Sequence, residues 1–139
     1  MNITIIDGQG GHIGVQLVKE ITTKFPDINL TAIGTNAVAA AAMLKAGANN
    51  AASGENSVVV ACRKADVIIG PIGIVIADSL LGEVTEKMAL AVSRADAVRI
   101  LIPLNKCENL VAGVSDLSAK ALISDVISKL NGIILSQST

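Results

Sequence analysis

A cluster of glycines near the start of the chain carries the strongest chemical signal in the sequence. Residues 5–14 read Ile-Ile-Asp-Gly-Gln-Gly-Gly-His-Ile-Gly, so an apolar run ends in Asp7 and a glycine-rich loop. Glycines let backbone N–H groups approach a ligand where a Cβ atom would clash. The following segment has the period of an amphipathic helix, whose apolar face consists of Ile13, Leu17, Ile21 and Phe25. Because a helix N-terminus favours anions, the pattern predicts a site for a small phosphorylated molecule.

Turn-forming and polar residues also gather where three other predicted strands end. They are Gly34-Thr35-Asn36, Gly70-Pro71-Ile72-Gly73 and Pro103-Leu104-Asn105, and the amino ends of the strands carry nothing comparable. In an open parallel sheet, ligands bind beyond the carboxyl ends of the strands, where the strand order reverses. We therefore expect these turns to converge on one concave mouth whose backbone amides are open to an anion.

The expected ligand is NAD(P) or another nucleotide, held by three of these loops. The expected contacts are Asp7, Gly8, Gln9, Gly10, Gly11, His12 and Ile13, then Gly34, Thr35 and Asn36, and finally Gly70, Pro71, Ile72 and Gly73. NAD-binding proteins of this architecture usually place Asp or Glu after the second strand to accept the ribose hydroxyls. The second loop supplies only neutral groups, so nothing in it would chelate a ribose, and Thr35 or Asn36 also suits the N-cap of the next helix.

Several ionisable residues leave two interpretations open. Asp7 either caps the N–H groups of its own loop or contacts a ligand or metal. His12 is either a proton donor or a tolerated side chain at the rim of the loop. The carboxylates of Glu55, Asp78 and Glu83 either converge or serve as partners of helix dipoles. Cys107, beside Lys106, is either a reactive thiol or an inert one. No metal site and no catalytic residue can be assigned.

Strand-type runs alternate with helix-period segments along the chain, which predicts an α/β fold. We expect one domain over residues 1–139 with three layers, doubly wound around a mostly parallel sheet of five or six strands. The expected strands are residues 2–6, 28–33, 49–52, 67–70, 98–104 and, at an edge, 110–114. The expected helices are residues 11–25, 36–45, 54–65, 74–81, 85–94 and 116–130, followed by a frayed tail over 136–139.

Composition narrows the class of partner. Phe25 is the one aromatic residue, and 11 basic residues are scattered among 12 acidic ones, so the sequence lacks the stacking platforms and basic blocks of nucleic-acid-binding proteins. The apolar run at 67–77 is too short to span a bilayer, and Asp7 interrupts the one candidate for a signal peptide. The two cysteines form no disulfide framework. We expect a cytoplasmic protein that binds neither nucleic acid nor membrane.

The segment at 72–81 is unusually apolar for the surface of a small domain. It is interrupted only by Gly73, Asp78 and Ser79. It must lie under the terminal helix or form a subunit interface, and we favour the interface and hence a homo-oligomer.

The first loop resembles the nucleotide loop of the short-chain dehydrogenases and related NAD(P)-binding families, whose pattern is Thr-Gly-x-x-x-Gly-x-Gly. Gly8, Ile13 and Gly14 match that pattern, Asp7 replaces the usual Thr, and His12 replaces the middle glycine. The resemblance implies a Rossmann-like fold over the first third of the chain. Those dehydrogenases catalyse with a Tyr-x-x-x-Lys pair, and this sequence contains no tyrosine.

A second resemblance spans nearly the whole chain and is carried by six segments. They are residues 6–11, 34–37, 43–49, 54–56, 69–77 and 100–107. Together they look like a small bacterial family of unknown function. That resemblance implies a single Rossmann-like domain and supplies no activity or catalytic residue.

Three functions follow from these observations. The first is a nucleotide- or dinucleotide-binding sensor or accessory protein without redox chemistry of its own. The second is an enzyme acting on a small anionic metabolite, with Asp7, Asn36, Glu55 and Asn105 around the substrate and a divalent metal as an option. The third is an oligomeric interaction module built on the apolar segment at 72–81. The sequence does not identify the ligand.

Overall fold

A computed structural model describes residues 1–104 and 109–138, which form a three-layer α/β structure. Five parallel strands make one sheet in the order β3-β2-β1-β4-β5. The strands are β1 (Asn2–Asp7), β2 (Asn29–Gly34), β3 (Asn50–Ser53), β4 (Val67–Pro71) and β5 (Val98–Ile102). The order reverses between β1 and β4, as in doubly wound, Rossmann-like folds. The predicted fold class is confirmed.

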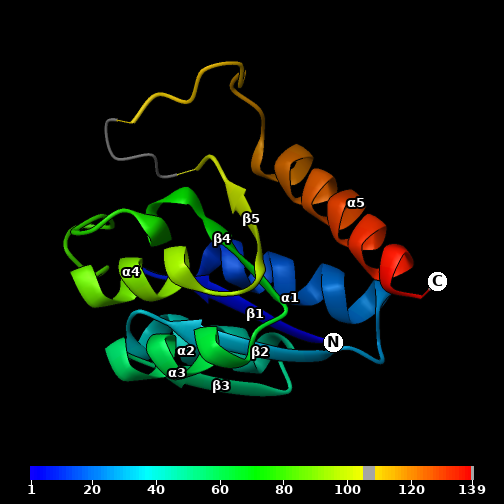
Figure 1. Ribbon diagram of the computed structural model, residues 1–139, viewed down its shortest axis with the longest axis horizontal. Coiled ribbons are helices and arrows are strands. Elements are labelled where there is room, and N and C mark those ends of the chain that lie inside the picture. The colour runs from blue at the N-terminus through cyan, green and yellow to red at the C-terminus, as the bar shows by residue number, and fades with distance from the viewer. Residues whose placement is uncertain (105–108, 139) are drawn as a thin grey trace.

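Helices cover both faces of the sheet because the chain crosses over between β3 and β4 (Figure 1). On one face lie α1 (His12–Lys24), α2 (Ala37–Ala46) and α5 (Ala119–Gln137). On the other face lie α3 (Glu55–Lys64), the 3₁₀ turn η1 (Ile72–Val75) and α4 (Glu86–Arg94). Each face has its own apolar core, one centred on Ile5 and Leu17 and the other on Ile68 and Met88.

Three expected elements differ from the structure. The segment at 74–81 is not a helix, because η1 ends at Val75 and the backbone then turns through left-handed conformations at Asp78, Leu80 and Leu81. Residues 110–114 form no strand. The terminal helix starts later than expected, at Ala119, because Ser118 caps it by accepting the Ala121 N–H. It continues to Gln137, whereas a frayed tail was expected from residue 136.

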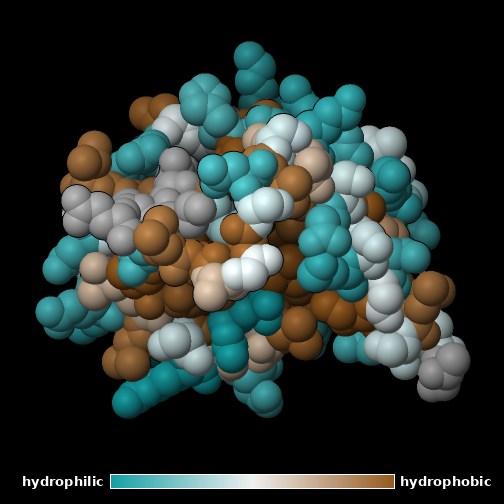
Figure 2. All heavy atoms as spheres, turned by 90° about the horizontal axis from the view of Figure 1, so that it is seen from above, coloured by the Kyte–Doolittle hydropathy of each residue, from teal (hydrophilic) through white to brown (hydrophobic). Residues whose placement is uncertain are grey.

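In the view of Figure 2, brown apolar side chains gather in a band across the middle of the face, and hydrophilic side chains surround it. Among the described residues, no helix has both the length and the apolar character needed to cross a membrane. The apolar residues that are strongly exposed include Leu81, Leu110 and Val38.

Candidate functional site

Asp7 organises the glycine loop that follows β1. Its carboxylate accepts the Gly8 N–H at 2.8 Å with Oδ1 and the Gly14 N–H at 2.7 Å with Oδ2. The side chain is 4 % exposed. Both oxygens are therefore bound to the backbone of the same loop, and the capping interpretation of Asp7 is confirmed.

Burial decides the proton affinity of Asp7. Desolvation raises the pKa of this carboxyl above its usual value, and the nearby Glu83 carboxylate raises it further. The Gly14 and Gly8 N–H groups and the charge of His12 act in the opposite direction but do not overcome the effect of burial. Asp7 is thus a structural acid whose pKa lies above its ordinary value.

Close approach explains two of the glycines. A Cβ atom at Gly14 would overlap the Sδ atom of Met43 and lie 3.1 Å from the Cβ atom of Asp7, so glycine lets α1 pack tightly against α2 and β1. Gly11 has a φ of 76° and lies against Ala39, where a side chain would be strained as well as crowded. The loop is therefore compact because α1 and α2 begin side by side.

Glu83 joins the loops after β1 and β2. Its Oε1 atom accepts the Gln9 N–H at 2.9 Å, the Thr35 hydroxyl at 2.7 Å and the Asn36 side-chain amide at 2.6 Å. Desolvation raises the pKa of this carboxyl, but the hydrogen bonds from Gln9, Thr35 and Asn36 outweigh it, so the pKa lies below its ordinary value. Glu83 is an ionised carboxylate bound to three donors. We call these donors, Gln9, Thr35 and Asn36, the donor triad.

Asn36 has three roles in this cluster. Its Oδ1 atom accepts the Ala39 N–H at 2.9 Å, which is the N-cap bond of α2. Its amide nitrogen donates to the Gln9 carbonyl at 2.9 Å as well as to Glu83. The cap that the sequence predicted at this position is confirmed, and the same side chain also ties the first two loops together.

The segment at 76–85, which we call the Glu83 loop, is held in place by its own backbone. Asp78 donates to the Val84 carbonyl at 2.7 Å, and Val84 donates back to the Ser79 carbonyl at 3.2 Å. The buried Ser79 hydroxyl donates to the Gly73 carbonyl. Asp78, Leu80 and Leu81 have φ values of 67°, 55° and 57°, a conformation that costs residues other than glycine about 1–2 kcal/mol each. Strain of this kind concentrates at ligand clamps and switch regions.

The backbone amides of Gly10, His12 and Ile13 line the start of α1. None of them donates a hydrogen bond in the part of the chain that the structure describes, whereas Gly11 donates to the Gly8 carbonyl and Gly14 donates to Asp7. Gly10 and His12 are exposed, and the imidazole of His12 folds back over Gly10. Three N–H donors at a helix N-terminus thus have no acceptor among the described residues, which is the arrangement that favours an anion.

The prediction of a concave mouth with open backbone amides is wrong in one respect. The first two loops do converge, but the Glu83 carboxylate and the Leu80 side chain occupy the space above Gly8, where a Cβ atom would lie 3.1 Å from Glu83 Oε1 and 2.9 Å from Leu80 Cδ1. The Gln9 amide is therefore not open. A sequence cannot show this, because the loop that delivers Glu83 lies 74 residues further along the chain.

The third expected loop takes no part in the cluster. Gly70 lies inside the sheet, where a Cβ atom would overlap the Ile6 carbonyl, and Gly73 is buried and accepts from Ser79. Pro71 ends β4, and Ile72 begins η1. Gly73 thus supports the Glu83 loop, and none of the four residues makes a described contact with Gln9, Thr35 or Asn36. Asn105, Lys106 and Cys107, and with them the proposed thiol, lie outside the described residues.

The other candidate groups stay apart from this cluster. Glu55 starts α3, and no hydrogen bond or ion pair joins it to Asp7 or Asn36 within residues 1–104 and 109–138. In the same ranges no three His, Cys, Asp or Glu side chains are placed to hold a metal ion. Burial raises the pKa of the Cys62 thiol to about 11, so this cysteine is an inert core residue.

The parallel sheet, its reversal between β1 and β4 and the glycine loop at that reversal define a small Rossmann-like protein. The chain belongs to the family described as "Domain of unknown function (DUF3842)", whose pattern matches residues 2–134. The predicted membership of an uncharacterised family is thereby confirmed. No curated protein and no solved structure matches the chain.

Proposed function

We propose that this protein binds a nucleotide at the carboxyl ends of β1 and β2, as a sensor or accessory protein without redox chemistry of its own. In this proposal a phosphate group accepts hydrogen bonds from the free amides of Gly10, His12 and Ile13. The ribose hydroxyls donate to the Glu83 carboxylate. A dinucleotide such as NAD(P) and a mononucleotide both present these two groups.

One observation carries the proposal, namely the position of Glu83. Its Oε1 atom is fixed by the donor triad, while Oε2 accepts no hydrogen bond among the described residues. An ionised carboxylate with a free oxygen beside the ends of β1 and β2 is the group that accepts ribose hydroxyls in NAD-binding proteins of this architecture. Here it comes from the Glu83 loop rather than from the end of β2.

The distribution of charge supports a ligand with separate phosphate and hydroxyl ends. The Glu83 carboxylate repels a phosphate, whereas the N-terminus of α1 attracts one. The two features lie on either side of Gln9, whose N–H is already bound to Glu83. A ligand that offers hydroxyls to Glu83 and an anion to the helix satisfies both. We place this activity in the cytoplasm, in keeping with the free, buried thiol of Cys62.

Nucleotide analogues test the proposal directly. ADP and NAD should raise the melting temperature of the protein, since a ligand at a hundred times its dissociation constant adds about 2.7 kcal/mol of stability. In calorimetric titrations, 2′,3′-dideoxy-ADP should bind about tenfold more weakly than ADP, because it lacks the donors that meet Glu83. The Glu83→Ala variant should bind both nucleotides equally, while the Glu20→Ala control, at an exposed site on α1, should keep the preference.

Two results would overturn the proposal. The first is the absence of any stabilisation by NAD(H), NADP(H), ADP or ATP at millimolar concentrations. The second is a ribose preference that survives in Glu83→Ala, since the hydroxyls would then be bound by another group.

A further inference from the structure

The face of the sheet next to α3 carries an unexpected row of polar side chains. Thr4 of β1 pairs in register with Thr31 of β2, and Thr31 pairs with Asn50 of β3. In a parallel sheet, adjacent strands lie about 4.8 Å apart, and both faces are normally apolar because helices cover them. The next row on the same face is apolar, with Ile6 beside Ile33 and Ile33 beside Ala52. We call Thr4, Thr31 and Asn50 the polar row.

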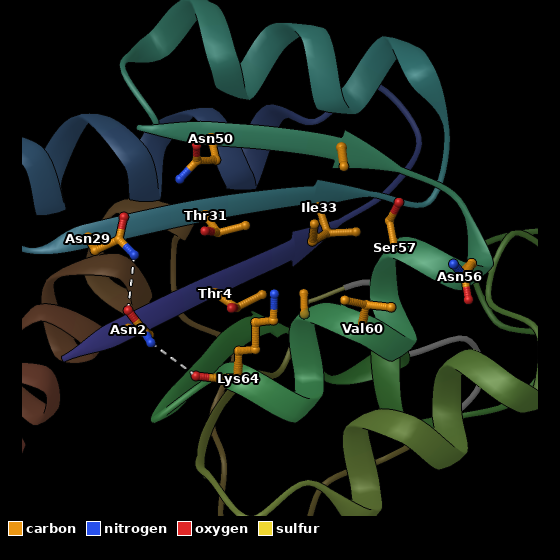
Figure 3. Close-up of a pocket in the computed structure, with 12 residues that line it drawn as sticks. Asn2, Thr4, Asn29, Thr31, Ile33, Asn50, Asn56, Ser57, Val60 and Lys64 are labelled. Atoms are coloured by element: carbon orange, nitrogen blue, oxygen red, sulfur yellow. Dashed lines mark hydrogen bonds between the residues drawn. The ribbon is translucent and has the colours of Figure 1, made fainter.

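The polar row forms the floor of a groove of about 480 Å³. Its far wall is α3, which supplies Ser57, Val60 and Lys64 (Figure 3). At one end the Asn2 amide donates to the Lys64 carbonyl at 3.2 Å, and Asn29 donates to the Asn2 side-chain oxygen at 2.9 Å. These two bonds close the amino end of the groove. The volume falls within the range of small-molecule sites.

Thr4 is the strongest sign that the groove takes a ligand. The residue is 3 % exposed, yet its hydroxyl makes no hydrogen bond with any described residue. No fully sealed side-chain nitrogen or oxygen in the described structure lacks a partner, so the Thr4 oxygen must border open space in the groove. A buried hydroxyl is costly unless it is satisfied, which makes this position one that a ligand or water must complete.

The charges of the groove limit the chemistry of its occupant. Lys64 is the one charged residue among the described residues that line it, and Figure 3 shows its side chain extending toward the strands. The other polar groups are neutral amides and hydroxyls that donate and accept. Ile33, Val60 and Ala61 add apolar surface. The lining therefore suits several hydroxyl groups, an aliphatic skeleton and one negative charge.

We propose that this groove is a second binding site, for a small aliphatic molecule that carries hydroxyl groups and one anionic group. Its hydroxyls would bind the polar row, and its anion would pair with Lys64. The groove shares no lining residue with the donor triad or with Glu83. Binding in this groove can therefore be tested separately from binding at the nucleotide site.

Three small probes separate the contributions of charge and hydroxyl groups. D-gluconate has both, sorbitol has the hydroxyls without the charge, and hexanoate has the charge without the hydroxyls. In NMR titrations of the folded protein, gluconate should shift the Thr4, Thr31 and Asn50 signals saturably, and the other two should bind at least about tenfold more weakly. Thr4→Val should weaken gluconate binding about tenfold without lowering the melting temperature, since the lost hydroxyl has no hydrogen-bond partner among the described residues.

Matched variants keep the test specific. Lys64→Met should abolish the difference between gluconate and sorbitol, while Lys24→Met and Thr23→Val, on α1, should leave gluconate binding unchanged. The proposal is wrong if none of the probes shifts the polar row at concentrations up to the millimolar range, or if Thr4→Val binds gluconate normally. It is equally wrong if these signals shift with protein concentration alone, because a second copy of the chain would then cover the groove.

Discussion

The pKa values of two carboxylates near the glycine loop are shifted in opposite directions because their surroundings differ. Asp7 is buried and accepts two backbone N–H groups, and desolvation raises its pKa. Glu83 is half-buried, and three donors lower its pKa in spite of desolvation. Asp7 thus maintains the loop, whereas Glu83 offers a charge to the surface. Their effects on stability should have opposite dependence on pH.

Glu83 should stabilise the protein at neutral pH and not in acid. Its folded pKa lies below its unfolded value of 4.5, so its contribution is present above that pH and is lost as the pH falls through the folded pKa. The difference in unfolding free energy between wild type and Glu83→Gln, from urea titrations, should therefore shrink between pH 6 and pH 3. A difference that grows in acid would show that the donor triad does not stabilise the charge.

Removal of Asp7 should destabilise the loop. Asp7→Ala leaves the Gly8 and Gly14 amides without an acceptor, which should lower the unfolding free energy by about 1–3 kcal/mol. Asp7→Asn should cost less, because it keeps one acceptor and removes the buried charge. Because the folded pKa of Asp7 is raised, its favourable contribution to stability is lost as the pH rises through that pKa. The unfolding free energy of Asp7→Asn relative to the wild type should therefore increase with rising pH. Equal losses in both variants, or no change relative to the exposed Asp27→Asn control, would contradict this account.

At the scale of elements, two glycines in helices have different reasons to be there. In α1, a Cβ atom at Gly14 would overlap Met43, which is fully buried. In α5, a Cβ atom at Gly132 would meet nothing within 4 Å. The first glycine is required by packing, and the second only lowers helix propensity.

Alanine substitutions distinguish these cases. Gly14→Ala should destabilise the protein by about 1–3 kcal/mol through overpacking. Gly132→Ala should stabilise it by about 0.5–1 kcal/mol, because alanine loses less entropy in a helix. Thermal unfolding of the two variants measures both effects. If Gly14→Ala were as stable as Gly132→Ala, α1 and α2 could not pack as closely as described.

Sequence patterns predicted the elements well where local chemistry determines them. The alternation of strands and helices and the cap at Asn36 are local signals, and both are confirmed. The prediction of a helix at 74–81 was wrong. The apolar content of this segment favours a helix, but the chain forms a turn there that buries Ile74 and Leu80 in the core. The polar row has a sequence signal of its own, since polar residues alternate with Ile and Leu in β1 and β2.

The candidate site was only partly predictable for a related reason. Gly8 to Ile13 and Gly34 to Asn36 are contiguous patterns, so their meeting follows from the strand order. The place of Glu83 depends on how a distant loop folds over them. A carboxylate near the functional edge could be expected, but its three donors could not.

At the scale of the whole molecule, the edge of the sheet offers a second surface for the expected homo-oligomer. The segment at 72–81 packs on its own core through Ile74 and Leu80 rather than under α5, while its Leu81 is 94 % exposed. The strand β5 pairs only with β4 among the described residues, and its Val98 is 50 % exposed. An open edge strand is a template for pairing with another chain. We propose that copies of the protein associate through β5.

Light scattering tests this proposal at high protein concentration. The wild type should have the mass of at least two chains, and Val98→Lys should reduce it to one because a charge blocks edge pairing. Leu81→Lys, at a residue that is 94 % exposed, should leave the mass unchanged. A single-chain mass for the wild type, or dissociation by Leu81→Lys, would contradict association through β5.

The central position of β1 has a consequence for how the protein reaches its native state. Ile3 is aligned with Leu30 on one side and with Val67 on the other, so its second neighbour comes from much further along the chain. Closing the larger loop costs more entropy, and such distant pairings slow folding. The half of the sheet built from β1 to β3 should therefore assemble first, and one edge of β1 should stay unpaired until β4 folds. During synthesis on the ribosome, that unpaired edge is where misassociation would begin.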